Sequence, residues 1–352
     1  MPEPSPLPPV TYYRLRDPTC SFRIAADEYI HHLRAESIAV EERDLDFTPS
    51  VLSKSDPSTP IGIVHTLFFF FAWHGLTFNS VIGALKKRHK ILLGMEVADT
   101  DRISPRFVQW ANHPAVNGIM LPSRFSCEAL RNSGVVTPLS VVPHGIRLTA
   151  PSPRFDYLRQ YHRPVILSFA SHSPVRKGWD ILRELIPKFP SCLFVIKASD
   201  SGETYFRDLQ NTLIINEWLS PSDLASLNTN SDVFVSFQRG GAFELNCAEA
   251  VGYGLPVVTT RYGCVLDYLD DDNAWLADVA RLEKVYPDDT ADHCGLGATA
   301  DIVSACRKLQ EVVLNLEQSK QRARNAMYQA RADLTWQKAT QKLIDFLHER
   351  SE

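Results

Sequence analysis

The stretch SDVFVSFQRGGAFELNCAEAVGYGLPVVTTRYG, residues 231–263, decides the fold prediction. An apolar run at 233–236 leads into a glycine-rich loop at 239–241, and a helical pattern over 243–252 leads into a second apolar run at 256–260. A strand, a helix and a strand in this order predict a βαβ unit of a parallel sheet. Glycines let a backbone approach a ligand closely, and the N-terminus of a helix offers free N–H groups to an anion. The segment therefore suits a diphosphate.

Glu244 and Glu249 follow the loop inside the predicted helix. A carboxylate one or two turns into that helix could reach the two hydroxyls of a ribose. A tight turn and a packing helix with solvated glutamates explain the same residues equally well. This segment alone leaves both interpretations open.

The segment LSFASHSPVRKGWDIL, residues 167–182, has a similar arrangement. Its apolar run is followed by His172, Arg176 and Lys177, and then by a helix that begins after Gly178. Cations at the carboxyl end of a strand favour a phosphate site, because they stabilise negative charge on a departing diphosphate. A solvated basic turn is the simpler interpretation of this segment taken alone.

Outward from these segments, short apolar runs alternate with amphipathic helical patterns, and the linker-like composition APSPR at 150–154 divides the chain near its middle. We expect an α/β protein with two Rossmann-like, doubly wound parallel-sheet domains facing a central cleft, a layout shared with periplasmic binding proteins and several kinases. The expected parts are a disordered lead-in at 1–9, an N-terminal domain at 10–150, a C-terminal domain at 151–330, and a helix at 331–352 that can cross back to the first domain. Strands are expected at 10–15, 37–40, 62–67, 90–95, 118–122 and 139–142, and again at 164–170, 193–197, 213–215, 233–236 and 256–260.

Composition excludes several classes of protein. The 352 residues carry a net charge of -4, and an acidic chain gives no electrostatic case for binding nucleic acid. Seven cysteines are scattered without a C-x-x-C pair, which argues against a disulfide framework or a zinc site and favours the reducing cytoplasm. The apolar stretch 61–73 is too short to span a bilayer and the N-terminus is no signal peptide. Peripheral membrane contact stays open.

Several motifs follow one another in the second part of the chain. They are VVPHGI at 141–146, RKGWDIL at 176–182, NEWLSPSDLASLNTNSDVFVS at 216–236, GGAFELNCAEAVGYGLPVV at 240–258 and LTWQKATQKLIDFL at 334–347. Each motif is modest by itself, but their order and spacing resemble glycosyltransferase family four, the large retaining group with the GT-B fold. The resemblance runs from about Val116 to the C-terminus.

This resemblance implies roles for residues of the second domain. Glu249 matches the glutamate that binds the ribose of a donor nucleotide, and Lys177 matches the lysine that neutralises the donor diphosphate. Residues 243–247 would offer backbone N–H groups to sugar and phosphate, and Glu217 and Trp218 stand where the base packs. The implied catalytic residues are Lys177, His172, Arg176 and Glu244; the implied donor-binding residues are Glu249, Gly241, Ala242, Phe243, Leu245, Asn246, Glu217 and Trp218.

The sequence departs from the family pattern at three places. Gly241 stands where the family has its first motif glutamate, and Glu244, three positions later, could take over the sugar contact. His172 stands where the family has an arginine, for which Arg176 or a protonated His172 could compensate. The glycine pair expected after the first strand is replaced by RLRDPTCSFR at 14–23. These departures leave donor preference and activity open.

The N-terminal domain is expected to bind the acceptor. Glu96 and Asp99 follow an apolar run and would lie at the cleft, while His65 and His74 are further candidates. Asp99 fits a helix cap equally well, and His74 fits a surface or core-edge histidine better than a ligand.

The resemblance implies a retaining, metal-independent hexosyltransferase that uses a nucleotide diphosphate sugar as co-substrate and no further cofactor. The acceptor would be a hydroxyl of a glycan, a lipid or a small molecule. Two alternatives stay open: a catalytically degenerate relative that binds a nucleotide or a glycan, and a sugar-nucleotide epimerase of similar fold.

Overall fold

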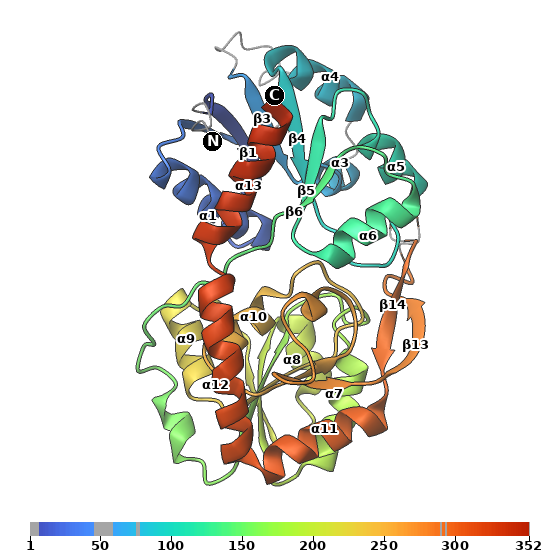
Figure 1. Ribbon diagram of the computed structural model, residues 1–352. Coiled ribbons are helices and arrows are strands. Elements are labelled where there is room, and N and C mark those ends of the chain that lie inside the picture. The colour runs from blue at the N-terminus through green and yellow to red at the C-terminus, as the bar shows by residue number, and fades with distance from the viewer. Residues whose placement is uncertain (1–6, 46–58, 75–77, 289–290, 293, 352) are drawn as a thin grey trace. The chain divides into compact units, whose positions relative to one another are not determined.

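The computed structural model describes residues 7–45, 59–74, 78–288, 291–292 and 294–351. The chain forms two compact units (Figure 1), each described here by itself. Unit 1 comprises Met1–Gly145, Ala291–Cys294 and Trp336–Glu352, and unit 2 comprises Ile146–Thr290 and Gly295–Thr335. Most of the lead-in expected at 1–9 lies outside the described residues.

Unit 1 contains a parallel sheet of six strands in the order β2-β1-β3-β4-β5-β6. From β1 the chain first adds β2 on one side and then β3 on the other, so the strand order reverses between β1 and β3. Open parallel sheets bind ligands at the carboxyl ends of their strands where the order reverses. The strands are β1 Val10–Arg14, β2 Val40–Asp44, β3 Ile61–His65, β4 Ile91–Met95, β5 Gly118–Leu121 and β6 Leu139–Val141.

Helices cover this sheet, and the last helix of the chain packs against the first one (Figure 1). The ring of Trp336 meets the ring of Tyr29 edge-on, with centroids 5.2 Å apart. Local sequence sets the helix ends: Ser123 accepts the N–H of Ser126 at the start of α6, and Gly134 ends it with a left-handed φ of 101°. The helices are α1 Ser21–Ala35, α3 Phe69–His74, α4 Phe78–Arg88, α5 Pro105–Ala111, α6 Arg124–Ser133 and α13 Trp336–Ser351.

Unit 2 contains a second parallel sheet, in the order β12-β11-β10-β7-β8-β9. Its strand order reverses between β7 and β10, so the loops after these two strands flank the expected ligand site. The strands are β7 Val165–Ala170, β8 Leu193–Ala198, β9 Thr212–Ile215, β10 Val233–Ser236, β11 Val257–Thr260 and β12 Trp275–Ala277.

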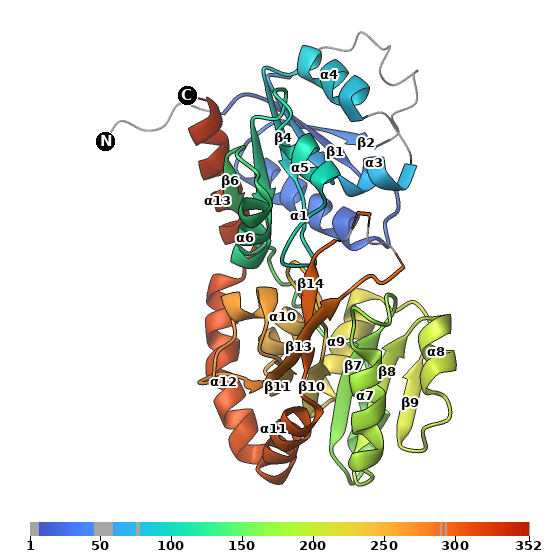
Figure 2. The same cartoon turned by 90° about the vertical axis from the view of Figure 1, so that its right-hand side faces the viewer.

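The helices of unit 2 lie on both faces of its sheet, with α7 and α8 in front of the strands in Figure 2. An antiparallel hairpin, β13 Val279–Lys284 with β14 Leu296–Ala300, follows the sheet. The helices are α7 Trp179–Leu185, α8 Asp200–Phe206, α9 Pro221–Thr229, α10 Leu245–Gly252, α11 Ile302–Leu314 and α12 Leu316–Asp333, with short 3-10 turns at Asp156–Gln160, Ile186–Lys188 and Gly263–Asp267. No helix of the described part of the chain is long and apolar enough to cross a membrane.

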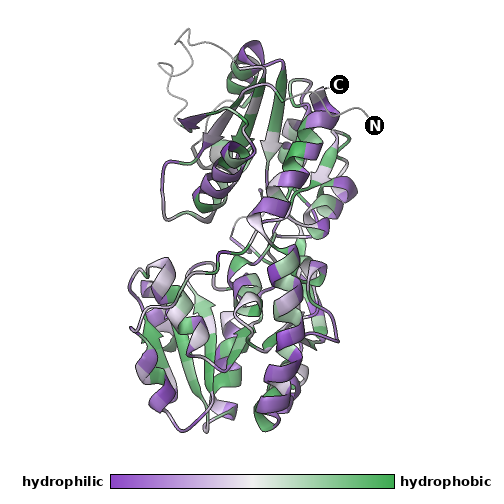
Figure 3. Ribbon diagram, turned by 60° about the vertical axis from the view of Figure 1, so that its left-hand side comes forward, coloured by the Kyte–Doolittle hydropathy of each residue, from purple (hydrophilic) through white to green (hydrophobic). Residues whose placement is uncertain are grey.

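The central strands are apolar and the outer helix faces polar in both units (Figure 3). Ile166, Val195 and Val235 are fully buried, as expected for strands with helices on both faces. The expected strand at 37–40 is wrong, because the second strand is Val40–Asp44, with the sequence VEERD. It lies at the edge of the sheet, where charged side chains reach solvent, so an apolar run does not mark it.

Candidate functional site

The loops that follow β7 and β10 meet at the reversal point of unit 2. The backbone N–H of Arg239 donates to the carbonyl of Arg176 over 2.7 Å. A Cβ on Gly178 would lie 2.0 Å from the carbonyl oxygen of Phe237, and Gly178 has a φ of 64°. Only a glycine allows this approach without displacing the backbone. Two segments about 60 residues apart in sequence are thereby held together.

Lys177 lies in this junction with its charge paired. Its Nζ is 2.9 Å from Oε1 of Glu244 and 3.4 Å from Oε1 of Gln238. The side chain of Lys177 is 15% exposed and that of Glu244 is 7% exposed. An ammonium group has three N–H donors, so these two acceptors leave one donor for a ligand.

Glu244 does not lie within the helix, as the sequence had suggested. Helix α10 begins at Leu245, and Glu244 precedes it at the N-cap position with a left-handed φ of 61°. This conformation is uncommon for a residue with a side chain. It turns the carboxylate of Glu244 back toward Lys177 instead of along the helix surface.

Gly241 lies beneath these polar groups. A Cβ at Gly241 would be 3.0 Å from Nε2 of Gln238 and 3.1 Å from Oε1 of Glu244. The ends of both side chains therefore occupy the space where a side chain of residue 241 would begin. Sequence reasoning missed Gln238, which follows β10 and carries no motif.

Arg239 anchors the glycine-rich loop to neighbouring segments of unit 2. Its guanidinium forms a two-bonded ion pair with Asp180, at 2.9 and 2.7 Å, and a second pair with Glu283 at 2.6 Å. It also donates to the carbonyl of Val175, and its side chain is 3% exposed. Burial acts to raise the pKa of Glu283, but hydrogen bonds from Thr299, Arg239 and Arg281 outweigh it and lower that pKa to about 2. Arg239 thus joins α7, the loop and the hairpin.

His172 and Arg176 are neighbours in the loop after β7. Nη2 of Arg176 lies 3.0 Å from Nε2 of His172. A guanidinium can only donate, so Nε2 of His172 accepts and carries no proton in this arrangement. Arg176 is 8% exposed, and its guanidinium also approaches the carbonyl of Gly240 at 3.4 Å.

Glu249 lies on α10, five residues after Glu244. Burial raises the pKa of Glu249 to about 7, against a hydrogen bond from the backbone N–H of Arg147 and the charge of that arginine. A carboxylate can accept hydrogen bonds from ribose hydroxyls.

The remaining donor candidates divide into two groups. Ala242 and Phe243 are buried, and Leu245 and Asn246 contribute the first N–H groups of α10, which have no preceding helix carbonyl to bond. Glu217 and Trp218 follow β9, two strands and about 10 Å from β7. Glu217 pairs with Arg154, and Trp218 is 67% exposed. The described contacts do not bring this second group to Lys177.

The acceptor candidates of unit 1 lie at the carboxyl ends of β3 and β4. His65 is 1% exposed, and its Nδ1 is 3.0 Å from the hydroxyl of Tyr12. Burial, helped by nearby His144, lowers the pKa of His65 to about 3, so it is neutral at physiological pH. The side chain of His74 lies outside the described residues.

Glu96 is fully buried and accepts the backbone N–H groups of Phe68 and Val97. Burial raises its pKa to about 8 despite these bonds. Its carboxyl group thus holds the start of α3 against β4, which is a structural task. Asp99 is half-buried and near enough to Glu96 to help raise that pKa.

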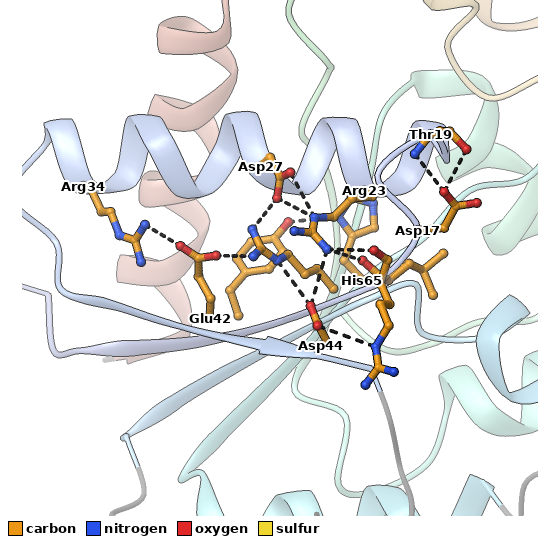
Figure 4. Close-up of polar contacts among 12 residues, drawn as sticks. Asp17, Thr19, Arg23, Asp27, Arg34, Glu42, Asp44 and His65 are labelled. Carbon is orange, nitrogen blue, oxygen red and sulfur yellow. Dashed lines mark hydrogen bonds and ion pairs between the residues drawn. The ribbon is translucent and has the colours of Figure 1, made fainter. Parts of the chain in front are cut away.

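A charged network that the sequence did not reveal fixes the loop between β1 and α1 (Figure 4). Arg14 and Arg23 both pair with Asp27 of α1 and Asp44 of β2. Arg23 also donates to the carbonyl of Leu15 over 2.9 Å. This loop replaces the expected glycine pair, and the arginines hold it in one conformation.

Comparison with known proteins adds independent information. The family described as Glycosyl transferases group 1 matches residues 163–286. A protein of Sulfolobus islandicus rod-shaped virus 1, "Uncharacterized protein 356", is 30% identical over 85% of this chain and 87% of its own length. "Putative glycosyltransferase 45" of Sulfolobus islandicus filamentous virus is 30% identical over 67% of each chain.

Two solved structures show the same fold. HepE from Anabaena, crystallised with UDP and glucose, has a TM-score of 0.70 at 15% identity, covering 97% of this chain and 100% of that one. WaaG, a glycosyltransferase of lipopolysaccharide biosynthesis, has a TM-score of 0.64 at 13% identity, covering 96% and 99%. Together with the two six-stranded sheets, these matches establish the GT-B fold. The chain belongs to the glycosyltransferases, and its residues 163–286 form a glycosyl transferases group 1 domain.

Proposed function

We propose that this glycosyltransferase moves a sugar from a nucleoside diphosphate sugar, most simply a UDP-sugar, to an acceptor hydroxyl with retention of configuration. The observation that carries the proposal is the junction at the reversal point of unit 2, where Lys177, Glu244 and Gln238 converge beside the start of α10. The complex of HepE with UDP and glucose supports the choice of base.

The diphosphate would lie between Lys177 and the first N–H groups of α10. Both are positive, and both become more favourable as negative charge grows on the departing phosphate. The ribose would lie toward Glu249 and the transferred sugar toward Glu244, since Glu249 lies on α10 and Glu244 faces Lys177 before the helix begins. Arg176 would add positive charge behind the loop.

In the proposed reaction, the bond between C1 of the sugar and the terminal phosphate oxygen breaks. The acceptor oxygen bonds to C1 on the same face, and the acceptor proton passes to the departing phosphate. Because Lys177 and the helix supply positive charge, we propose that no metal ion is required.

The test is transfer from UDP-, GDP-, ADP- and dTDP-sugars to hydroxyl acceptors, followed by NMR, with and without EDTA. We expect turnover only with donors that carry one particular nucleotide base. The product should have the same anomeric configuration as the donor, and EDTA should not lower the rate. Inverted product or EDTA-sensitive turnover would contradict the mechanism.

A second candidate, a nucleotide-sugar-binding protein without turnover, is favoured by one observation. Lys177 already has a carboxylate partner, so a diphosphate must share it with Glu244. Calorimetric binding of a UDP-sugar without hydrolysis or transfer to any acceptor would favour this candidate.

A further inference from the structure

Gln238 is buried beside the proposed donor site, and its side chain has few hydrogen-bond partners among the described residues. It is 7% exposed. Its Oε1 accepts from Lys177 over 3.4 Å, and no partner of its Nε2 is found among the residues the structure describes. The Nε2 atom keeps access to solvent, so a ligand can bond to it in place of water. The end of the amide lies over Gly241, where a Cβ would be 3.0 Å from Nε2 and 3.1 Å from Oε1.

Three polar groups therefore meet near Gly241. Gln238 presents an N–H donor and Glu244 an acceptor oxygen over the glycine, and Nζ of Lys177 lies 2.9 Å from that oxygen. A hydroxyl group donates one proton and accepts with two lone pairs, so it can use all three groups. A phosphate oxygen can only accept, so it can use Lys177 but has no bond to form with Glu244.

We propose that Gln238 determines specificity for the transferred sugar: its Nε2 donates to one ring hydroxyl, whose proton points to Glu244. The inference rests on the proposed function and adds the contact that selects the sugar. The donor must then carry a free hydroxyl at that ring position. A site that hydrogen-bonds a substrate hydroxyl rejects analogues that lack it by about 10⁴-fold, since its buried polar groups stay unpaired.

The experiment compares kcat/KM for the preferred UDP-hexose and its monodeoxy analogues in wild type, Gln238→Leu and Gln238→Glu. Wild type should reject one analogue far more strongly than the others. Both variants should reduce that single discrimination at least tenfold. The matched control is Gln321→Leu on the exposed surface of α12, which should leave every ratio unchanged.

The outcomes separate the two proposals. Equal losses for all analogues, or unchanged discrimination in both variants, overturn the role of Gln238. If UDP fails to raise the melting temperature of wild type, the proposed function fails and the role of Gln238 falls with it. Melting temperatures show whether the two variants fold. If Gln238→Leu does not fold, Gln238→Glu still tests the proposal, because its side chain has nearly the same shape as glutamine.

Discussion

Nζ of Lys177 lies 2.9 Å from Oε1 of Glu244, although 67 residues separate them in the chain. This contact joins the loop after β7 to the start of α10. It places a cation and a carboxylate together at the reversal point of the sheet, where a ligand with both acceptors and hydroxyls can use them. The predictions below begin from it.

Lys177→Ala should reduce kcat by about 10²–10³, the usual loss when one donor to a developing oxyanion is removed. The control is Lys188→Ala, which removes an exposed lysine paired only with Glu184 on the same helical segment. Steady-state kinetics measure both variants. Wild-type turnover in Lys177→Ala would exclude the lysine from the chemistry.

Moving the carboxylate from residue 244 to residue 241 should restore the transferase activity that is lost when Glu244 is removed. Glu244→Gly removes the group that pairs with Lys177 but suits the left-handed backbone, so it should fold well and turn over slowly. Gly241→Glu with Glu244→Gly returns a carboxylate to the same space, because the Cβ of residue 241 would begin 3.1 Å from the present Oε1 of Glu244. We expect the double variant to be faster than Glu244→Gly. Equal or slower turnover would contradict the shared position.

Glu249 should make donor binding depend on pH. Its pKa of about 7 means that it is mostly protonated below pH 6, and ribose hydroxyls bind better to the ionised form. The affinity for a UDP-sugar should therefore rise between pH 5.5 and 7.5 and level off above. Calorimetry with the UDP-sugar measures this change in affinity, because the diphosphate of a UDP-sugar does not titrate in this range. Glu249→Gln should abolish the pH dependence.

The same pKa affects stability with the opposite sign to an ordinary surface carboxylate. Because the folded pKa lies above the ordinary glutamate value of 4.5, the native state binds more protons than the unfolded state between about pH 4.5 and 7. The contribution of Glu249 to folding stability should fall as pH rises through that window. Urea unfolding of Glu249→Gln should show a smaller decline than wild type, and a steeper decline would contradict the assignment.

Arg239→Ala should destabilise unit 2 by about 2–3 kcal/mol, because it removes the buried guanidinium bonded to Asp180 and Glu283, while both carboxylates still reach solvent. The matched control is Arg261→Ala, which breaks a pair with exposed Asp271 and should cost about 1 kcal/mol or less. Chemical denaturation gives both values. Similar small losses in the two variants would show that Arg239 is not the anchor of the loop.

The sequence by itself determined the class of fold, because strands that helices cover on both faces are continuous apolar runs, which are visible in the local sequence. It also predicted the loop on which Lys177 lies and the helix that carries Glu249, since glycine and cation positions next to strands and helix starts are local features. The weakly patterned parts, the charged edge strand Val40–Asp44 and the hairpin β13–β14, were misplaced or missed, because neither has a continuous apolar run.

Only the tertiary structure decided which side chains meet. The order of strands places β7 beside β10, and this brings Gln238 and Glu244 to Lys177. The left-handed backbone of Glu244 then carries its carboxylate over Gly241, and the burial that shifts the pKa values of His65, Glu96 and Glu249 comes from distant segments. Contacts across 60 residues depend on how the sheet is assembled, and no local pattern encodes that.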